Sequence, residues 1–334
     1  MQKKIFKAFI VERTHNNEFA GTVKDSTIDK LKDGEILIRV NYSSLNYKDA
    51  LSAKGNKGVT KKYPHIPGID ASGIVEESAA DDINAGDKVI VTGYDLGMNT
   101  PGGFGQYVRV PASWAVRLPD GLTLKESMIF GTAGFTAALS VHKLIESVKP
   151  QHGEILVTGA SGGVGSVAVA VLSRLGYTVA AVSGKANARV FLEQLGAKEI
   201  ISRDKFLEHS KWSLLKARWA GAIDTVGGDM LANLIKSTRP LGVVTCCGNV
   251  ASPELSMTVY PFILRGVTLI GIDSQSCPVT LRRQIWTKLA GEWKIDMLGD
   301  IYSEISIYDL NDAIERILKG QLKGRTVVNL NLLE

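Results

Sequence analysis

Short apolar runs alternate with segments of helical periodicity between residues 154 and 272. The runs lie at residues 154–157, 177–183, 199–201, 221–226, 242–248 and 267–272. Nearly continuous apolar strands separated by helices are typical of a parallel sheet covered on both faces. We therefore predict six strands in a doubly wound α/β domain, which would bind its ligand at the carboxyl ends of the strands. A parallel sheet without a nucleotide is the alternative.

A glycine-rich turn follows the first run. Read as G-x-G-x-x-G, the segment 158–165 has Ala160 in the first glycine position, while Gly162, Gly163 and Gly165 remain. Such a turn needs small residues, because the backbone bends sharply, a pyrophosphate approaches the helix N-terminus and the helix packs on the strand. The strand, turn and apolar helix together predict a dinucleotide-binding unit, and hence an oxidoreductase.

The end of the second run bears on which nicotinamide cofactor binds. An acidic residue there would favour NADH, but the sequence is Ser183-Gly184-Lys185. A hydroxyl, exposed backbone N–H groups and a cation suit a 2′-phosphate, and Arg189 and Arg203 follow closely. NADPH is therefore favoured. Lys185 could also be an ordinary solvated lysine, since 39 of the 334 residues are Lys or Arg.

The first 127 residues show a different pattern. Short apolar runs at residues 35–40, 73–75, 87–91 and 107–110 are separated by Gly, Pro and Asp turns, with little helical periodicity. This pattern predicts a compact all-β or barrel-like domain. Two helices, at 280–293 and 309–319, and a final strand at 325–329 should pack back on it. We expect one domain from residues 1–127 with 276–334 and a second from 128–275.

Composition narrows the function classes. The net charge of +5 is modest and dispersed, which gives little support for nucleic-acid binding. We see no long uncharged apolar stretch and no signal-peptide pattern at the N-terminus, so we expect a cytoplasmic protein without a membrane partner. Three cysteines agree with a reducing compartment, and adjacent Cys246 and Cys247 are expected to be small core residues rather than a redox pair.

Several motifs, in order, carry a resemblance to a known family. They are Ser43-Ser44-Leu45-Asn46-Tyr47-Lys48-Asp49-Ala50-Leu51, Ile66-Pro67-Gly68-Ile69-Asp70, Gly131-Thr132-Ala133-Gly134-Phe135-Thr136-Ala137, Val157–Gly165, Pro261-Phe262-Ile263-Leu264-Arg265 and Gly324-Arg325-Thr326-Val327-Val328. The chain resembles the acryloyl-CoA reductase branch, formerly labelled quinone oxidoreductase, of the zinc-independent medium-chain dehydrogenases/reductases. The resemblance implies a GroES-like β-barrel catalytic domain plus a doubly wound parallel Rossmann domain, and a homodimer joined through the strand at 267–272.

The resemblance also implies site residues. Cofactor contacts would come from Tyr47, Thr132, Ser161, Gly162, Gly163, Val164, Ser183, Gly184, Lys185, Arg203, Asn249, Ile263, Ser274 and Arg325. Catalytic candidates are Tyr47 as orienting donor or proton source, with Asn46, Asp70 and Arg325 around it. Tyr47 could instead be a core aromatic residue, and Asp70 a turn residue after Pro67-Gly68. Relatives usually carry Arg at position 185, and the identity of Asn249 departs from the family pattern.

The metal ligands of the zinc-dependent relatives have no counterparts here. All three cysteines come late in the chain, and His65 is the only imidazole near the expected site, so we expect no metal. Without a Lewis acid, hydride addition to an activated double bond is easier than ketone reduction. We predict NADPH-dependent reduction of a short enoyl thioester, acryloyl-CoA to propanoyl-CoA. Lys48, Lys54, Lys57, Lys61 and Lys62 could meet the coenzyme A phosphates or form a solvated face. A quinone or enone reductase and a non-catalytic NADPH-binding sensor or structural protein are the alternatives.

Overall fold

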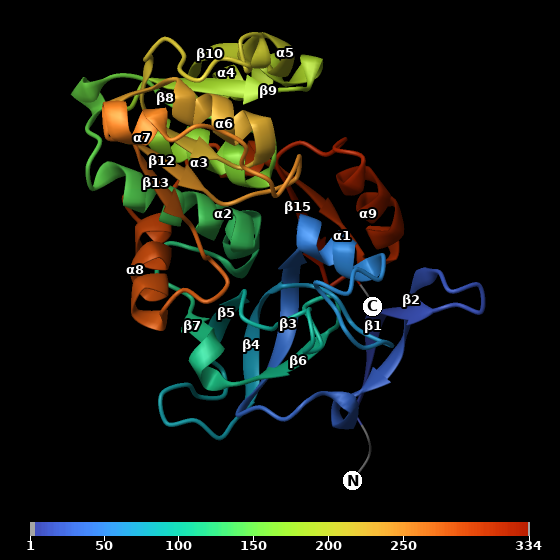
Figure 1. The fold of residues 1–334 in the computed structure, drawn as a ribbon. Helices are drawn as coiled ribbons and strands as arrows, with labels where there is room; N and C mark the ends of the chain where they lie inside the picture. The colour runs from blue at the N-terminus through green and yellow to red at the C-terminus, as the bar shows by residue number, and fades with distance from the viewer. Residues whose placement is uncertain (1–3, 333–334) are drawn as a thin grey trace. The chain divides into compact units, whose positions relative to one another are not determined.

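The computed structural model describes residues 4–332 (Figure 1). The chain forms two compact units. Unit 1 contains the described residues up to Thr132, then Gln275–Ala290 and the residues from Leu298 onward; unit 2 contains Ala133–Ser274 and Gly291–Met297. Each unit is described separately below.

Unit 1 is built on a mixed sheet in the order β14-β15-β3-β4-β5-β7, with β6 also paired to β3. Its strands are β3 (Ile36–Ser44), β4 (Asp70–Ser78), β5 (Lys88–Thr92), β6 (Tyr107–Val110), β7 (Ala115–Arg117), β14 (Tyr302–Ile305) and β15 (Arg325–Asn329). The last strand pairs antiparallel with β3, Val327 opposite Ser44. The prediction that the C-terminal segment packs back on the first domain is therefore confirmed.

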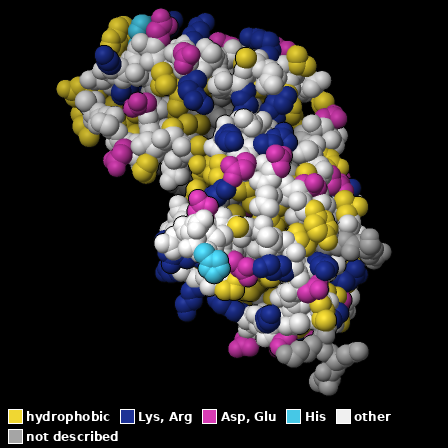
Figure 2. Space-filling view, turned by 90° about the vertical axis from the view of Figure 1, so that its right-hand side faces the viewer, with side chains coloured by type: hydrophobic (Ala, Val, Ile, Leu, Met, Phe, Trp, Pro, Cys, Tyr) yellow, Lys and Arg dark blue, Asp and Glu magenta, His cyan; other side chains and the backbone are white. Residues whose placement is uncertain are grey.

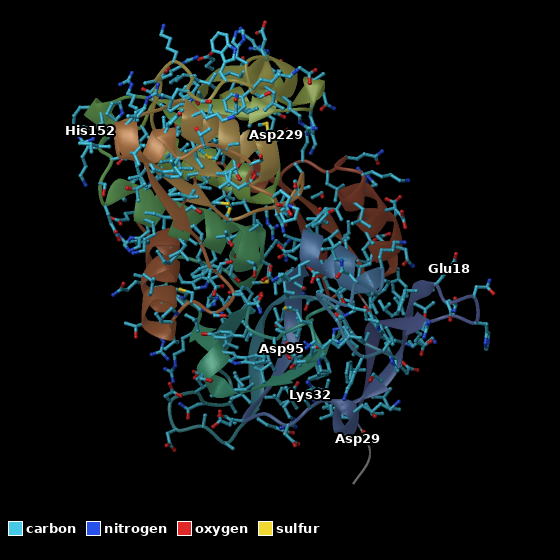
Figure 3. The ribbon with its side chains drawn as sticks, viewed as in Figure 1. Glu18, Asp29, Lys32, Asp95, His152 and Asp229 are labelled. Atoms are coloured by element: carbon cyan, nitrogen blue, oxygen red, sulfur yellow. The ribbon has the colours of Figure 1, made fainter. Side chains whose placement is uncertain are left out.

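A hairpin of β1 (Ile5–Arg13) and β2 (Phe19–Thr27) was not predicted from the sequence. Its β1 strand alternates buried and partly exposed residues and contributes Phe6, Phe9 and Val11 to the core, while Glu18 lies at its tip (Figure 3). The helices of unit 1 are α1 (Tyr47–Ala53), α8 (Val279–Ala290) and α9 (Leu310–Leu318). The buried core of the β strands continues into α9 through Leu310 and Ile314.

Unit 2 confirms the predicted parallel sheet. Its strands are β8 (Ile155–Val157), β9 (Val179–Ser183), β10 (Ala197–Ser202), β11 (Trp219–Asp224), β12 (Thr238–Cys246) and β13 (Thr268–Gly271). They run in the order β10-β9-β8-β11-β12-β13, and every printed pair is parallel. The helices are α3 (Gly163–Arg174), α4 (Arg189–Gln194), α5 (Arg203–Leu207), α6 (Gly228–Lys236) and α7 (Tyr260–Arg265).

The division of the chain differs from expectation in three places. The first boundary falls after Thr132 rather than after residue 127, inside helix α2 (Leu124–Ile145). Gln275 belongs to unit 1 rather than to the second domain. Residues 291–297, expected in the first domain, belong to unit 2. There Arg174 donates to the carbonyl of Glu292 and pairs with Asp296 at 2.8 Å, contacts between distant segments that sequence patterns do not reveal.

Helix α2 also departs from expectation in its apolar length. By length and composition it is apolar enough to cross a membrane, although 78 % of its apolar stretch is buried inside the protein, as in a core helix. On the face shown in Figure 2, cationic and anionic side chains are interspersed. That mixture agrees with the dispersed charge of the sequence.

Candidate functional site

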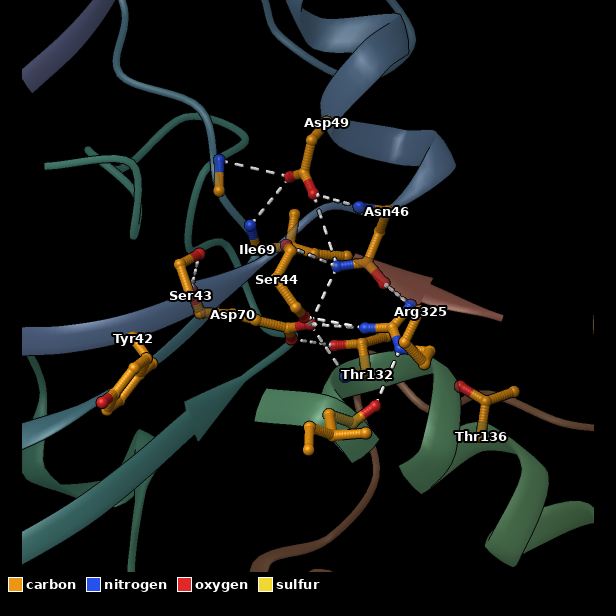
Figure 4. Close-up of polar contacts among 12 residues, drawn as sticks. Tyr42, Ser43, Ser44, Asn46, Asp49, Ile69, Asp70, Thr132, Thr136 and Arg325 are labelled. Atoms are coloured by element: carbon orange, nitrogen blue, oxygen red, sulfur yellow. Dashed lines mark hydrogen bonds and ion pairs between the residues drawn. The ribbon is translucent and has the colours of Figure 1, made fainter. Parts of the chain in front are cut away.

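A buried polar cluster in unit 1 is centred on the carboxylate of Asp70, the first residue of β4 (Figure 4). Asn46 donates to its Oδ2 from Nδ2 at 2.8 Å, and Ser44 from Oγ at 2.5 Å. Thr132 adds its backbone N–H at 2.9 Å to Oδ2 and its hydroxyl at 2.5 Å to Oδ1. The structure thus brings together Asn46, Asp70 and Thr132, three of the residues predicted for the site.

Arg325, the first residue of β15, closes the cluster from the other side. Its guanidinium donates to Ser44 Oγ at 2.8 Å, to Asn46 Oδ1 at 3.3 Å and to the Ile129 carbonyl at 3.0 Å. It lies 3.8 Å from Asp70 Oδ2. Burial lowers the pKa of Arg325, while the carboxylates of Asp70 and Asp49 act in the opposite direction. A guanidinium satisfied in this way is suited to fixing its neighbours.

Asp70 and Arg325, the secondary catalytic candidates, are both buried. Asp70 is 0 % and Arg325 3 % exposed, and their polar atoms are engaged within the cluster. Groups so enclosed are well placed to fix the side chains around them. Asn46 is 8 % exposed and links the two, since its amide donates to Asp70 while its carbonyl accepts from Arg325.

Gly131 makes this cluster possible. It lies within α2 with φ 51° and ψ −159°, a conformation open essentially only to glycine. A Cβ at this position would stand 2.5 Å from Asp70 Oδ2, 2.5 Å from Ser44 Oγ and 2.7 Å from Arg325 Nη2. Helix α2 is therefore kinked at Gly131, where the cluster needs the space.

Tyr47 lies at the start of α1, directly after the N-cap residue Asn46. It is partly exposed, and no hydrogen bond to its hydroxyl occurs among residues 4–332. A core aromatic residue, the alternative role, would be buried and its hydroxyl would be hydrogen-bonded. The geometry leaves the phenol able to donate to a ligand.

Asp49 is central to the cluster, although no role for it is predicted from the sequence. Its Oδ2 accepts from the backbone N–H of Asn46 at 2.8 Å, and its Oδ1 from that of Ile69 at 2.8 Å. Burial, followed by the neighbouring Asp70, raises the pKa of Asp49 to about 7. The spacing Asn46-x-x-Asp49 is a capping-box signal that could have identified it.

The glycine-rich turn of unit 2 has the predicted form. Helix α3 begins after Gly162 without a side-chain cap, so its first N–H groups remain available to an anion. Ser161 Oγ lies 2.9 Å from Ser183 Oγ, which joins the turn to the end of β9. A Cβ on Gly165 would stand 2.4 Å from the carbonyl oxygen of Gly159, which explains the third glycine.

A cationic pocket of about 290 Å³ opens beyond the end of β9. Its lining includes the predicted Ser183, Gly184, Lys185 and Arg203. Arg189 was also expected here from the sequence. Ser202 and Asp204, which were not expected, bring a hydroxyl and an opposing charge. A Cβ on Gly184 would lie 2.8 Å from Arg203 Nη2, so the glycine allows the guanidinium to lie over the backbone.

The remaining predicted cofactor residues are scattered in unit 2. Gly163 and Val164 form the first turn of α3, as expected. Ser274 accepts a hydrogen bond from Thr136 at 2.7 Å, and Asn249 is exposed after β12. Ile263 is 69 % exposed on α7, and no contact within residues 4–332 joins it to the turn. Its place beside the nicotinamide stays a prediction.

The five lysines considered for coenzyme A are not equivalent. Lys48 donates to the side chain of Gln275 at 2.7 Å, and Lys54 forms an ion pair with Glu315. Lys57 lies 4.9 Å above the ring of Tyr63, and Lys61 and Lys62 are exposed. Only part of the run is therefore available to phosphates.

The residues of the cluster do not fit a zinc ion. Zinc ligands need free lone pairs on His, Cys, Asp or Glu, but both buried carboxylates already accept hydrogen bonds and face a guanidinium. Within residues 4–332, no three such side chains form a group that could hold a metal. His65, the nearby imidazole, lies 2.8 Å from the Gly97 carbonyl through Nε2 and belongs to a buried loop.

Comparison with known proteins places this arrangement in a family. Residues 32–120 match the family described as "Alcohol dehydrogenase GroES-like domain", and residues 163–290 match "Zinc-binding dehydrogenase". The chain is 42% identical to acrylyl-CoA reductase AcuI of Ruegeria pomeroyi, over 98% of this chain and 100% of the relative. It is 43% identical to YhfP of Bacillus subtilis, a candidate quinone oxidoreductase by name, over 98% and 99% of the two chains.

Solved structures agree. The yhdH oxidoreductase of Salmonella enterica in complex with NADP is 41% identical and superposes with a TM-score of 0.94, covering 97% of this chain and 99% of that one. YhfP with NAD bound gives the same TM-score at 42% identity, with 98% and 99% covered. With a GroES-like domain, a Rossmann domain and full-length relatives in hand, we conclude that the chain belongs to the acryloyl-CoA reductase and quinone oxidoreductase branch of the medium-chain dehydrogenases/reductases.

Proposed function

We propose that this protein reduces the activated carbon–carbon double bond of a short enoyl-CoA with NADPH, converting acryloyl-CoA to propanoyl-CoA. The observation that carries the proposal is the 42% identity to an acrylyl-CoA reductase over nearly the whole of both chains. The reaction adds a hydride to the β-carbon and a proton to the α-carbon, with the thioester carbonyl bearing negative charge in between. NADPH, when bound, supplies the hydride.

The residues of this chain would orient the substrate and stabilise that charge. The hydroxyl of Tyr47, at the N-terminus of α1, is the candidate donor to the thioester oxygen or to the α-carbon. Asn46, Asp70, Thr132 and Arg325 would fix the start of α1 rather than touch the substrate. A zinc-free mechanism follows from the chemistry, because a conjugated double bond needs only hydrogen-bond donors at the carbonyl.

NADPH is the proposed cofactor because of the cationic pocket after β9. Lys185, Arg189 and Arg203 would bind the 2′-phosphate, and Ser161 with Gly162, Gly163 and Val164 would hold the pyrophosphate at the start of α3. Asp204 in the same pocket lowers its net positive charge, and the relative YhfP was solved with NAD. NADH is therefore the necessary comparison in any assay.

Reduction of quinones or enones is the second candidate, favoured by the name of YhfP. The test is oxidation of NADPH, followed by absorbance, with acryloyl-CoA, crotonyl-CoA and a benzoquinone in parallel, then with NADH and with a chelator. Chelator-insensitive, NADPH-dependent turnover of acryloyl-CoA is expected. Preference for benzoquinone would replace the enoyl-CoA proposal, and tight NADPH binding without any turnover would favour a sensor or structural protein.

We also propose a homodimer joined through the edge strand β13, in a reducing, cytoplasmic location consistent with the free cysteines described. Around that edge, large apolar side chains are exposed. They are Leu241, Val259, Tyr260, Ile263 and Leu264. In light-scattering measurements, the Ile263→Glu variant should be a monomer. The control Val190→Glu, at a 64 % exposed position on α4, should remain a dimer. A wild-type monomer would refute this proposal.

A further inference from the structure

Asp49 joins two segments of unit 1 through one buried carboxylate. Its Oδ2 accepts from the backbone N–H of Asn46 at 2.8 Å and from Asn46 Nδ2 at 3.3 Å. Its Oδ1 accepts from the backbone N–H groups of Ile69 at 2.8 Å and Gly68 at 3.2 Å. The start of α1 is thus tied to the turn that leads into β4 and Asp70 (Figure 4).

Every one of these partners is a donor. A carboxylate can accept all four hydrogen bonds, whereas a protonated carboxyl would direct its own O–H toward an N–H group and lose at least one of them. The charged groups that face Asp49 from the packed elements are Asp70 on β4 and Arg325 on β15. Helix α9 presents Glu315, which is engaged by Lys54 at the other end of α1.

We propose that Asp49 is a positioning residue for the reaction: in its ionised form it fixes the first turn of α1, and with it the side chains of Asn46 and Tyr47. This inference rests on the proposed function, because Tyr47 is the group it would place at the substrate. Asp49 is 0 % exposed and enclosed by backbone, so it acts only through these neighbours.

The ionisation of Asp49 gives this role a pH dependence. Burial and the nearby Asp70 raise the pKa of Asp49 to about 7, from a model-peptide value of 3.8. Below pH 7 the carboxyl takes up a proton and the competent form declines, to about one tenth of the molecules at pH 6. Because the pKa is higher in the folded protein than in the unfolded chain, the stability contributed by this group does not fall as the pH is lowered through 7. Activity is therefore lost without unfolding.

The decisive experiment compares Asp49→Asn with Asp309→Asn in the full-length protein. Asp309 caps the short turn before α9 in the same way, accepting from the Ser306 backbone N–H at 2.9 Å, but it lies at the surface. We expect Asp49→Asn to lower kcat for acryloyl-CoA at least tenfold, with the Kd for NADPH, from fluorescence titration, changed less than twofold. Asp309→Asn should leave kcat within twofold of wild type.

The pH profile separates positioning from a merely structural role. In wild type, kcat should fall about tenfold between its plateau and pH 6 while the far-ultraviolet circular dichroism is unchanged, and this limb should vanish in Asp49→Asn. A wild-type profile that is flat from pH 8 to 6, or one retained in Asp49→Asn, would overturn the proposal. The wild-type measurement stands even where Asp49→Asn does not fold.

Failure of the proposed function would look different. If wild type reduces benzoquinone but no enoyl-CoA, the enoyl-CoA assignment is wrong, and the same pH limb and its loss in Asp49→Asn are then measured with benzoquinone. If no acceptor is reduced at all, the proposed function fails and Asp49 has no reaction to serve.

Discussion

Replacing Gly131 by Ala should break the buried cluster of unit 1. The residue has φ 51° and ψ −159°, and a side chain in that region costs roughly 1–3 kcal/mol. The added Cβ would approach Asp70, Ser44 and Arg325 to 2.7 Å or less, and forcing a methyl group into a packed site costs about 1–3 kcal/mol more. We expect Gly131→Ala to lower the free energy of unfolding by about 4 kcal/mol.

Gly176→Ala is the matched control. Gly176 also has a positive φ, 80°, but a Cβ there would meet nothing within 4 Å, so only the backbone cost of roughly 1–2 kcal/mol applies. Urea unfolding followed by circular dichroism measures both variants, and the difference between them isolates the collision with the cluster. Equal losses in the two proteins would show that the cluster yields easily and that our reasoning about its rigidity is wrong.

Three further predictions concern cationic side chains. Lys185→Arg introduces a fork-shaped donor and should tighten NADPH binding about threefold in fluorescence titrations while leaving NADH binding unchanged. Equal effects on both cofactors would show that residue 185 does not bind the 2′-phosphate. Arg325→Met leaves Asp70 buried without its cation and should cost about 3–5 kcal/mol in urea unfolding, whereas a loss below 1 kcal/mol would contradict the ion pair. Lys61→Glu combined with Lys62→Glu should raise the KM for acryloyl-CoA severalfold at low salt but leave the KM for benzoquinone unchanged. An equal change in both KM values would show that these lysines do not bind the coenzyme A phosphates.

The alternating pattern of the sequence was sufficient to predict unit 2. Each apolar run between residues 154 and 272 became a strand, because a strand buried on both faces is marked by its own residues. The pocket after β9 was likewise anticipated from Ser183-Gly184-Lys185, since ligands of such sheets bind beyond the strand ends. The cofactor contact expected of Ile263 stays a prediction, because a short motif gives the residue's position in the chain but not its neighbours in the fold.

The cluster of unit 1 could be predicted only in part. Asn46, Asp70 and Arg325 were identified individually, but their mutual contacts join β3, β4 and β15 across long sequence separations. Hydrophobic periodicity carries no information on such pairings. Asp49 was missed as a functional group because its burial follows from the turn at Gly68 and Ile69, which approaches α1 only in the folded protein.

Arg325 is synthesised long after the residues that it contacts, and this affects the order of folding. It contacts Asn46 across a separation of 279 residues, so at about 5–20 residues per second roughly 15–55 seconds pass between the synthesis of the two. Unit 2 is almost continuous in sequence and can fold during that interval, whereas β3 and β4 must wait for the partner strand β15 and the cation it carries. On the ribosome, the dinucleotide domain should therefore be complete first, and the acidic residues of the other domain should stay hydrated until the last strand is made.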